Sequence, residues 1–224
     1  MRYRGRLRQE LARCVVGGPI DFLMLQEHHL SERQIRQCGP ILQRHSDVFW
    51  SASYGPSGTQ GGVCISIGDS WRSAIVGRGI VVPGRAQWLL LQWGQQRLGM
   101  LNVYAPNHAS ARANFWSAIA LGLPTAADAW CVGGDFNMLE RIEDQRGGSL
   151  STILGAELVA WERLYLSLRL EDAWLHPCFA RSQGSLAFSR LDKRVGKMNM
   201  SRIDRFYVSD MFGDCGDLGW FLPL

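Results

Sequence analysis

The residues best suited to chemistry in this chain of 224 residues are an aspartate and an asparagine that directly follow an apolar stretch. Asp135 and Asn137 come after residues 130–132 and the glycine pair 133–134. In an extended segment, residues two positions apart point to the same side. One would serve as a base or metal ligand and the other as an orienting amide, which suits the placing of a water molecule against phosphorus. Glycine, aspartate and asparagine also form turns, but the apolar strand before them favours a functional role.

Glu27 stands in a similar place, at the end of the continuous apolar run 21–26. Such a run is typical of a strand covered on both faces, and open α/β sheets bind ligands at the carboxyl edge of their strands. A solvated residue that opens the next loop would look the same, so Glu27 alone leaves both interpretations open. His28 and His29 follow directly, and either could face a site at this edge.

Tyr104 ends the alternating segment 98–104, and Pro106 then turns the chain out of the sheet. A phenol at this point could donate a hydrogen bond to a non-bridging phosphate oxygen. Tyrosines at strand ends more often serve only for packing, so Tyr104 becomes informative only beside the other residues.

Asp204 lies on a strand face that is otherwise apolar, because the period of two places it with Phe206 and Val208. A carboxylate on such a face must be paired, hydrogen-bonded or metal-bound, and burial should raise its pKa. A salt bridge to Arg202 or Arg205 is the structural alternative, but Arg205 falls on the other side of the strand and Arg202 is two residues away. A role in a site is therefore favoured for Asp204.

A basic stretch separates Ser189 from Asp204 and is expected to form an exposed hairpin over residues 191–201. Its basic residues are Arg190, Lys193, Arg194, Lys197 and Arg202. A basic loop beside a cluster of carboxylates would let an enzyme hold a polyanion while cutting it. A merely solvated charged loop is an equal alternative.

The composition is that of a globular protein, with 46% hydrophobic and 20% charged residues. Apolar runs such as 88–91 are far shorter than the ~20 residues of a membrane helix, so no membrane partner is expected. The net charge of +4 fits a phosphate-bearing partner.

The elements that must position these residues are helices interleaved with a larger number of strands. Helices are expected at 2–16, after the capping box Ser31-x-x-Gln34, at 109–121 and at 152–168. Strands are expected at 21–26, 47–53, 62–67, 87–92, 98–104, 129–133, 185–190 and 202–209. This order predicts sheets between helices, an α/β layered fold in one domain. Two small α+β domains would be the alternative, but the sequence shows no linker between them.

Four blocks occur in the order LQEHHL, NVYAPN, GGDFNML and SRIDRFYVS. Together they resemble the endonuclease/exonuclease/phosphatase family, and most closely the endonuclease domain of LINE-type (non-LTR) retrotransposons. The resemblance covers essentially the whole chain. It implies one domain over residues 1–224, built as a four-layer α/β sandwich with two packed, mostly antiparallel sheets flanked by helices.

The resemblance also implies the activity, a DNA endonuclease that hydrolyses phosphodiesters with Mg²⁺ or Mn²⁺. By resemblance, Glu27 is the metal ligand, Asp135 positions or deprotonates the attacking water, and Asn137 orients the water or the phosphate. Tyr104 contacts the phosphate in the transition state, and Asp204 normally orients a histidine near the end of the domain.

The DNA-binding residues implied by the resemblance lie in and beside the hairpin. They are Ser189, Arg190, Lys193, Arg194 and Lys197. The sequence leaves the compartment and the oligomeric state open, although an active endonuclease of this kind would be intracellular and work in the nucleus.

The sequence differs from the family pattern at both of its ends. Family members begin with a strand in a block like N-x-R-G and end with a strand carrying Ser-Asp-His, and we expect both strands to be missing here. We therefore expect weak nicking by this chain. The alternatives are an inactive truncated relic that retains at most nucleic-acid binding, or a phosphoinositide or phospholipid phosphodiesterase of the same fold. The SRIDRF block and the basic hairpin speak against the phospholipid substrate.

Overall fold

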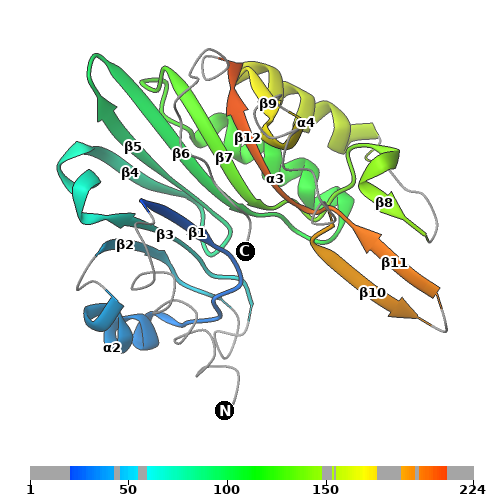
Figure 1. Ribbon diagram of the computed structural model, residues 1–224, viewed down its shortest axis with the longest axis horizontal. Coiled ribbons are helices and arrows are strands. Elements are labelled where there is room, and N and C mark those ends of the chain that lie inside the picture. Colours follow the sequence, from blue (N-terminus) through cyan, green and yellow to red (C-terminus); the bar gives the residue numbers. More distant parts are fainter. Residues whose placement is uncertain are drawn as a thin grey trace.

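The computed structural model describes residues 21–42, 46–54, 60–147, 153, 155–175, 188–194 and 197–210, with the backbone alone at 38–42, 192–194 and 197–198. They form an α/β structure in four layers (Figure 1). A helix, a small sheet, a large mixed sheet and a pair of helices follow one another. The predicted fold class, a four-layer α/β sandwich, is thereby confirmed.

The large sheet has six strands in the order β4-β5-β6-β7-β12-β9. Their bounds are Ile75–Val82 (β4), Ala86–Trp93 (β5), Gln96–Tyr104 (β6), Ala129–Asp135 (β7), Asp204–Ser209 (β12) and Leu170–Asp172 (β9). Neighbours are antiparallel except β6 and β7, which are parallel because α3 (Ala109–Gly122) crosses between them. The ends of β6 and β7 therefore meet at one edge of the sheet, where β12 begins.

The small sheet is antiparallel, with the order β1-β3-β2. The bounds on this side of the molecule are Phe22–Leu25 (β1), Ser46–Ser51 (β2), Val63–Gly68 (β3), Glu32–Leu42 (helix α2) and Asp69–Ala74 (short helix η1). Ile65 and Ile67 pack against Leu89, Leu91 and Met100 of the large sheet, and all five are buried. This apolar layer joins the two sheets, and α2 lies beside β2 on the outer side (Figure 1).

The other face of the large sheet is covered by α3 and α4 (Gly155–Ser167). Between them and the sheet lies an aromatic cluster in which the rings of Trp116, Phe136, Trp161 and Tyr207 pack 5.0–5.7 Å apart. Phe136 is the residue after β7, so this cluster anchors the edge at which β7 ends.

A three-stranded arm, called the arm below, extends away from the sandwich (Figure 1). It consists of β10 (Arg190–Arg194), β11 (Lys197–Ser201) and β8 (Gln145–Arg146). The short helices η2 (Ile142–Asp144) and η3 (Ala173–Leu175) lie near its base. The hairpin predicted at 191–201 is thus present, and it connects directly to β12.

Most of the expected elements are present, and the differences have physical causes. β4 was not predicted because Gly77 and Gly79 interrupt its apolar pattern, yet a Cβ on Gly79 would lie 2.7 Å from the indole of Trp88. β8 and β9 are too short to give a periodic signal. The expected helix at 2–16 and residues 185–187 of an expected strand lie outside the described residues. None of the described helices is long and apolar enough to span a membrane.

The capping box that was predicted at the start of α2 is present only in part. The Gln34 side chain accepts hydrogen bonds from the Ser31 backbone N–H (2.9 Å) and from the Ser31 hydroxyl (3.0 Å). The described contacts are thus the glutamine half of the box, in which Gln34 caps the Ser31 N–H, and a hydrogen bond from the serine hydroxyl to the same glutamine oxygen.

Candidate active site

Three of the predicted site residues form a row across neighbouring strands. Tyr104 of β6 pairs with Asp135 of β7, and Asp135 pairs in turn with Asp204 of β12. Neighbouring strands lie about 4.8 Å apart, so the three residues occupy about 10 Å of one sheet edge. The parallel register of β6 and β7 is what brings the tyrosine beside the aspartate.

Glu27 reaches this row from the small sheet, and its carboxylate accepts a hydrogen bond from the Tyr104 hydroxyl. Glu27 is exposed and has a φ of 52°, a left-handed conformation that is unusual for a residue other than glycine. Such backbone strain persists only where the surrounding structure holds it, and it clusters at functional sites.

Asn102 supports the backbone near Glu27, because its side chain links the two sheets. It is fully buried, and its Nδ2 donates to the carbonyls of Leu25 (3.0 Å) and Cys64 (2.8 Å). Its Oδ1 accepts from Gln26 Nε2 at 2.6 Å. Sequence reasoning missed Asn102, although an amide inside the otherwise apolar end of a strand was a signal that could have found it.

Asn137 also joins the site, but in a different way from the one expected. Its φ is 48°, so the chain turns here and is not extended. The Asp135 carboxylate accepts the Asn137 backbone N–H (2.9 Å) and the Asn137 Nδ2 (3.2 Å). The same Nδ2 donates to the Ala105 carbonyl at 2.9 Å. The two side chains meet because of a turn, so the turn and the functional interpretation are compatible.

The glycines before Asp135 are required by close packing. Gly134 has a φ of 140°, and a Cβ there would overlap the Val103 carbonyl of β6. A Cβ on Gly133 would overlap the ring of Phe206. Only glycine lets β7 approach both neighbouring strands closely enough to place Asp135 in the row.

Burial and neighbouring carboxylates raise the pKa of both carboxyl groups in the row. Burial and the charge of Asp204 raise the pKa of Asp135 to about 7, and Glu27 adds to the shift. The hydrogen bond from the Asn137 N–H and the charge of Arg190 act in the opposite direction. Burial and Glu27 also raise the pKa of Asp204, although a hydrogen bond with Ser189 acts the other way. Burial and Glu27 raise the pKa of Tyr104 as well, so its phenol stays a donor.

The close carboxylates of this site, Glu27, Asp135 and Asp204, are suited to binding a hard cation. Among the described residues, no three His, Cys, Asp or Glu side chains form a ready-made metal cage. Mg²⁺ does not need one, because it is commonly held by one or two carboxylates with water and phosphate oxygens completing the shell. Glu27 could hold the ion, and a cation there would offset the repulsion that raises the pKa of Asp135.

His28 does not face the site. It is buried, with Nδ1 accepting from the Leu30 N–H (3.0 Å) and Nε2 contacting the Ser51 carbonyl (3.2 Å). Burial lowers its pKa to about 4, so it stays neutral. It packs edge-on against Trp50 and supports the loop that carries Glu27.

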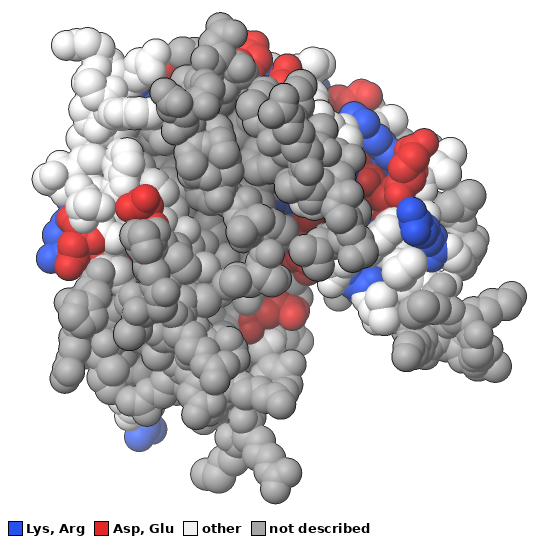
Figure 2. Space-filling model, viewed as in Figure 1, with Lys and Arg blue, Asp and Glu red and all other residues white. Residues whose placement is uncertain are grey.

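The predicted DNA-binding residues begin where the arm joins the row. The Ser189 hydroxyl accepts from the backbone N–H of Ile203 (3.2 Å) and of Asp204 (3.0 Å), so it positions the start of β12. Arg190 is exposed at the start of β10. Lys193, Arg194 and Lys197 belong to the two arm strands, and their side chains lie outside the described ones. Acidic and basic side chains lie side by side on the surface near the place where the arm joins the sandwich (Figure 2).

The sequence analysis placed Arg202 in the exposed basic stretch, and this prediction is wrong. It is buried and pairs with Asp144 (2.9 Å) and Asp172 (2.5 Å). Arg205, also buried, pairs with Asp144 (2.6 Å) and Glu140 (3.1 Å). The Tyr207 hydroxyl donates to Glu140 at 2.7 Å.

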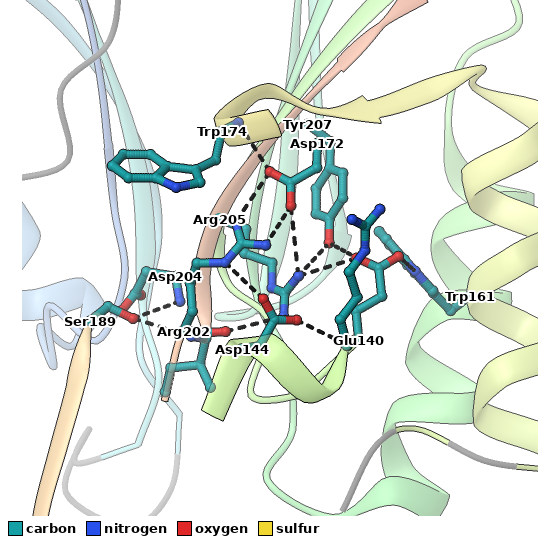
Figure 3. Close-up of polar contacts among 12 residues, drawn as sticks. Glu140, Asp144, Trp161, Asp172, Trp174, Ser189, Arg202, Asp204, Arg205 and Tyr207 are labelled. Carbon is teal, nitrogen blue, oxygen red and sulfur yellow. Dashed lines mark hydrogen bonds and ion pairs between the residues drawn. The ribbon is translucent and has the colours of Figure 1, made fainter. Parts of the chain in front are cut away.

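We call these six residues, Glu140, Asp144, Asp172, Arg202, Arg205 and Tyr207, the arginine network (Figure 3). Both arginines bind network carboxylates, which agrees with the expectation that neither neutralises Asp204. Sequence reasoning missed the acidic members of the network.

Known proteins resemble this chain in sequence and in fold. No family model matches the chain. An alignment over 157 residues that covers 67% of this chain shows 29% identity to an uncharacterized 149 kDa protein of transposon TX1 from Xenopus laevis, and it covers 11% of that protein.

Solved structures extend the likeness over most of the chain. The AP endonuclease LMAP from Leishmania major matches with a TM-score of 0.68 at 13% identity, covering 93% of this chain and 75% of that one. The endonuclease domain of TRAS1, a telomere-specific non-LTR retrotransposon, matches with a TM-score of 0.57 at 13% identity, covering 91% and 80%. The resemblance recognised in the sequence is thus confirmed for the fold: this chain has the endonuclease/exonuclease/phosphatase fold.

Proposed function

We propose that this chain is a divalent-metal-dependent phosphodiesterase that cuts DNA, an endonuclease of retrotransposon origin. The observation that carries the proposal is the row of Tyr104, Asp135 and Asp204, closed by the hydrogen bond from Tyr104 to Glu27. Its raised carboxyl pKa values describe a site short of positive charge. A metal ion and a phosphodiester supply what such a site needs.

Each residue has a defined task in the proposed reaction. Glu27 would hold Mg²⁺ or Mn²⁺, and the charge of that ion would stabilise the negative charge that develops on the phosphate. Asp135 takes a proton from the attacking water in its charged form, which a cation at Glu27 would favour. The water oxygen bonds to phosphorus while the bond from phosphorus to the leaving sugar oxygen breaks, and solvent protonates that oxygen. The Asn137 amide fixes the direction of that carboxylate. The Tyr104 phenol remains protonated; its one donor, which serves Glu27 in the free chain, would turn to a phosphate oxygen when Glu27 holds the metal.

The choice of DNA as substrate rests on the arm and on the comparisons. The arm begins beside the row at Ser189, and its sequence carries Arg190, Lys193, Arg194 and Lys197. Basic residues on an arm that leaves the site in this way would hold a phosphate backbone. The similar solved structures include an AP endonuclease and a retrotransposon endonuclease domain. The similar Xenopus laevis protein belongs to a transposon.

The test is conversion of supercoiled plasmid to open circles by the 224-residue chain in the presence of Mg²⁺ or Mn²⁺. One break per plasmid is enough for conversion, so slow nicking is measurable. We expect nicking to stop when the metal is chelated, and to fall by ~100- to 10,000-fold in Asp135→Asn, the range for losing a general base. Glu27→Gln should fall as well, whereas Glu32→Gln on the exposed face of α2 is the matched control and should nick like wild type.

A folded chain that binds the plasmid but leaves it intact at every metal concentration would contradict the proposal. It would favour a protein that retains only nucleic-acid binding. Release of phosphate-bearing product from phosphoinositide vesicles, without nicking of DNA, would contradict the choice of substrate while leaving the row as a phosphodiesterase site.

A further inference from the structure

We propose that Arg202 is a positioning residue, which, through Asp144 and Asp172, fixes Asp204 and the arm together in one place relative to Asp135. The consequence for catalysis rests on the proposed function. The consequence for structure does not.

Arg202 occupies the junction between the arm and the site. Residues 202–203 separate β11, which ends at Ser201, from β12, which begins at Asp204. Any rotation at this junction would move the arm and the Asp204 carboxylate relative to the rest of the row. The junction therefore decides whether the two work as one unit.

All four backbone polar groups of the junction are hydrogen-bonded. The Arg202 N–H donates to the Asp144 carbonyl (2.8 Å), and the Arg202 carbonyl accepts from Arg205 Nη2 (3.1 Å). The Ile203 N–H donates to the Ser189 hydroxyl (3.2 Å), and the Ile203 carbonyl accepts from the Phe136 N–H (2.8 Å). Two of these four partners, Asp144 and Arg205, belong to the arginine network.

The Arg202 side chain holds the junction from a second direction. Nε donates to Asp144 Oδ1 (2.9 Å), while Nη1 and Nη2 donate to the two oxygens of Asp172 (3.2 and 2.5 Å) (Figure 3). A guanidinium is a rigid planar fork, so three bonds in this arrangement define its orientation. Asp144 thus binds both the backbone and the side chain of one residue.

The two carboxylates are themselves held by independent contacts. Asp144 also accepts the Arg141 N–H (2.8 Å), and the next residue, Gln145, pairs with Ser201 of the arm. Asp172 accepts the Trp174 N–H (3.1 Å) and pairs with Tyr207 of β12. Arg202 is therefore fixed to the arm on one side and to the sheet on the other.

Stability alone does not account for this arrangement. Buried ion pairs can often be replaced by apolar residues without loss of stability, because desolvation offsets their attraction. What an apolar pair cannot reproduce is the set of directed bonds. Arg202 lies two residues before Asp204 and Arg205 directly follows it, so these directed bonds surround a residue of the row.

The experiment replaces the pair by apolar side chains in the full chain, as Arg202→Met/Asp172→Leu, and measures amide hydrogen exchange. We expect the amides of Ile203 and Asp204 to exchange at least ~10-fold faster than in wild type, because local opening is no longer restrained. The control Arg112→Met/Glu157→Leu removes the buried ion pair between α3 and α4 and should leave these two amides unchanged. Arg202→Lys, which keeps the charge but loses the fork, should give an intermediate rate and serves if the double variant does not fold.

The same variants are then assayed for plasmid nicking. We expect kcat to fall by ~10- to 100-fold, as when an outer supporting partner of a site is lost, with KM little changed because the arm still binds DNA. Wild-type exchange at Ile203 and Asp204 in a folded variant would overturn the positioning role, whether or not the chain nicks DNA. Faster exchange with a wild-type kcat would overturn the link to catalysis and leave the proposed function standing. Absence of nicking in wild type would count against the proposed function alone, because the exchange result would still decide the positioning role.

Discussion

Asp135 and Asp144 are both withdrawn from solvent near the base of the arm, yet their acidities shift in opposite directions. Burial raises the pKa of Asp135 to about 7, and the neighbouring carboxylates Asp204 and Glu27 act in the same direction. Burial alone would raise the pKa of Asp144 too, but Arg205 and Arg202 more than offset it and lower that pKa. Burial acts in the same direction on both carboxyls, so the charges beside each one decide why the two pKa values move in opposite directions. The row has carboxylates that a bound cation would neutralise, whereas the carboxylates of the network are already paired with Arg202 and Arg205.

The largest effect is expected from breaking the network. Asp144→Ala leaves two buried arginines short of a partner, and removal of one member of a buried ion pair costs about 3–5 kcal/mol of unfolding free energy. Urea unfolding at neutral pH measures it. Asp69→Ala, which removes an exposed partner of Arg72, should cost ~0–1 kcal/mol. Equal losses in the two variants would contradict the contrast drawn here.

The row should give the opposite result in its pH dependence. Asp135 has a pKa of about 7 when folded and ~3.9 when unfolded, so between these values the folded state keeps a proton that the unfolded state lacks. Linkage then requires wild-type stability to fall as pH rises through this window. Asp135→Asn removes that proton, and we expect its unfolding free energy to change less between pH 5 and pH 8. Parallel curves for the two proteins would show that Asp135 is an ordinary carboxyl.

Metal binding should sharpen the comparison by making the row behave like the network. A cation held at Glu27 would favour the charged form of Asp135 and lower its pKa. Carbon-detected NMR titration of the aspartate carboxyls should therefore show the titration near pH 7 moving to lower pH when Mg²⁺ is added. In Glu27→Gln the titration should move little. The Asp144 signal should not respond to Mg²⁺ in either protein.

A smaller effect is expected at the arm. Replacing Lys193, Arg194 and Lys197 by Ala should weaken DNA binding and flatten its salt dependence by about 0.9 in log–log slope for each lost phosphate contact. Arg33, Arg36 and Arg163, exposed on α2 and α4, provide a matched triple substitution that should keep the slope. Lys193 and Lys197 are the chain's two lysines, so DNA should also protect them from acetylation. An unchanged slope would mean that the arm is only solvated.

The comparison also explains how far the sequence could lead. Glu27, Tyr104, Asp135 and Asp204 were predictable because each begins or ends an apolar strand, which is a local pattern. The register that aligns them was not, because it depends on the crossover through α3. The turn at Asn137 shows the same limit, since its side chain meets Asp135 by a backbone conformation that spacing alone does not reveal.

The arginine network left even less trace in the sequence. Arg202 binds Asp144 across 58 positions and Asp172 across 30, and both carboxylates lie in elements of three residues. Neither element is long enough to show a period. A buried arginine and an exposed one look alike when neighbouring residues are polar, so Arg202 was assigned to the basic surface.

The central claim is that Glu27, beside the row, binds a divalent cation. Electron paramagnetic resonance of free Mn²⁺ during titration with the chain measures this directly. We predict binding in the wild type that weakens by about tenfold or more in Glu27→Gln, while Glu32→Gln, on the exposed face of α2, binds like wild type. Equal Mn²⁺ affinity in wild type and Glu27→Gln would contradict the account.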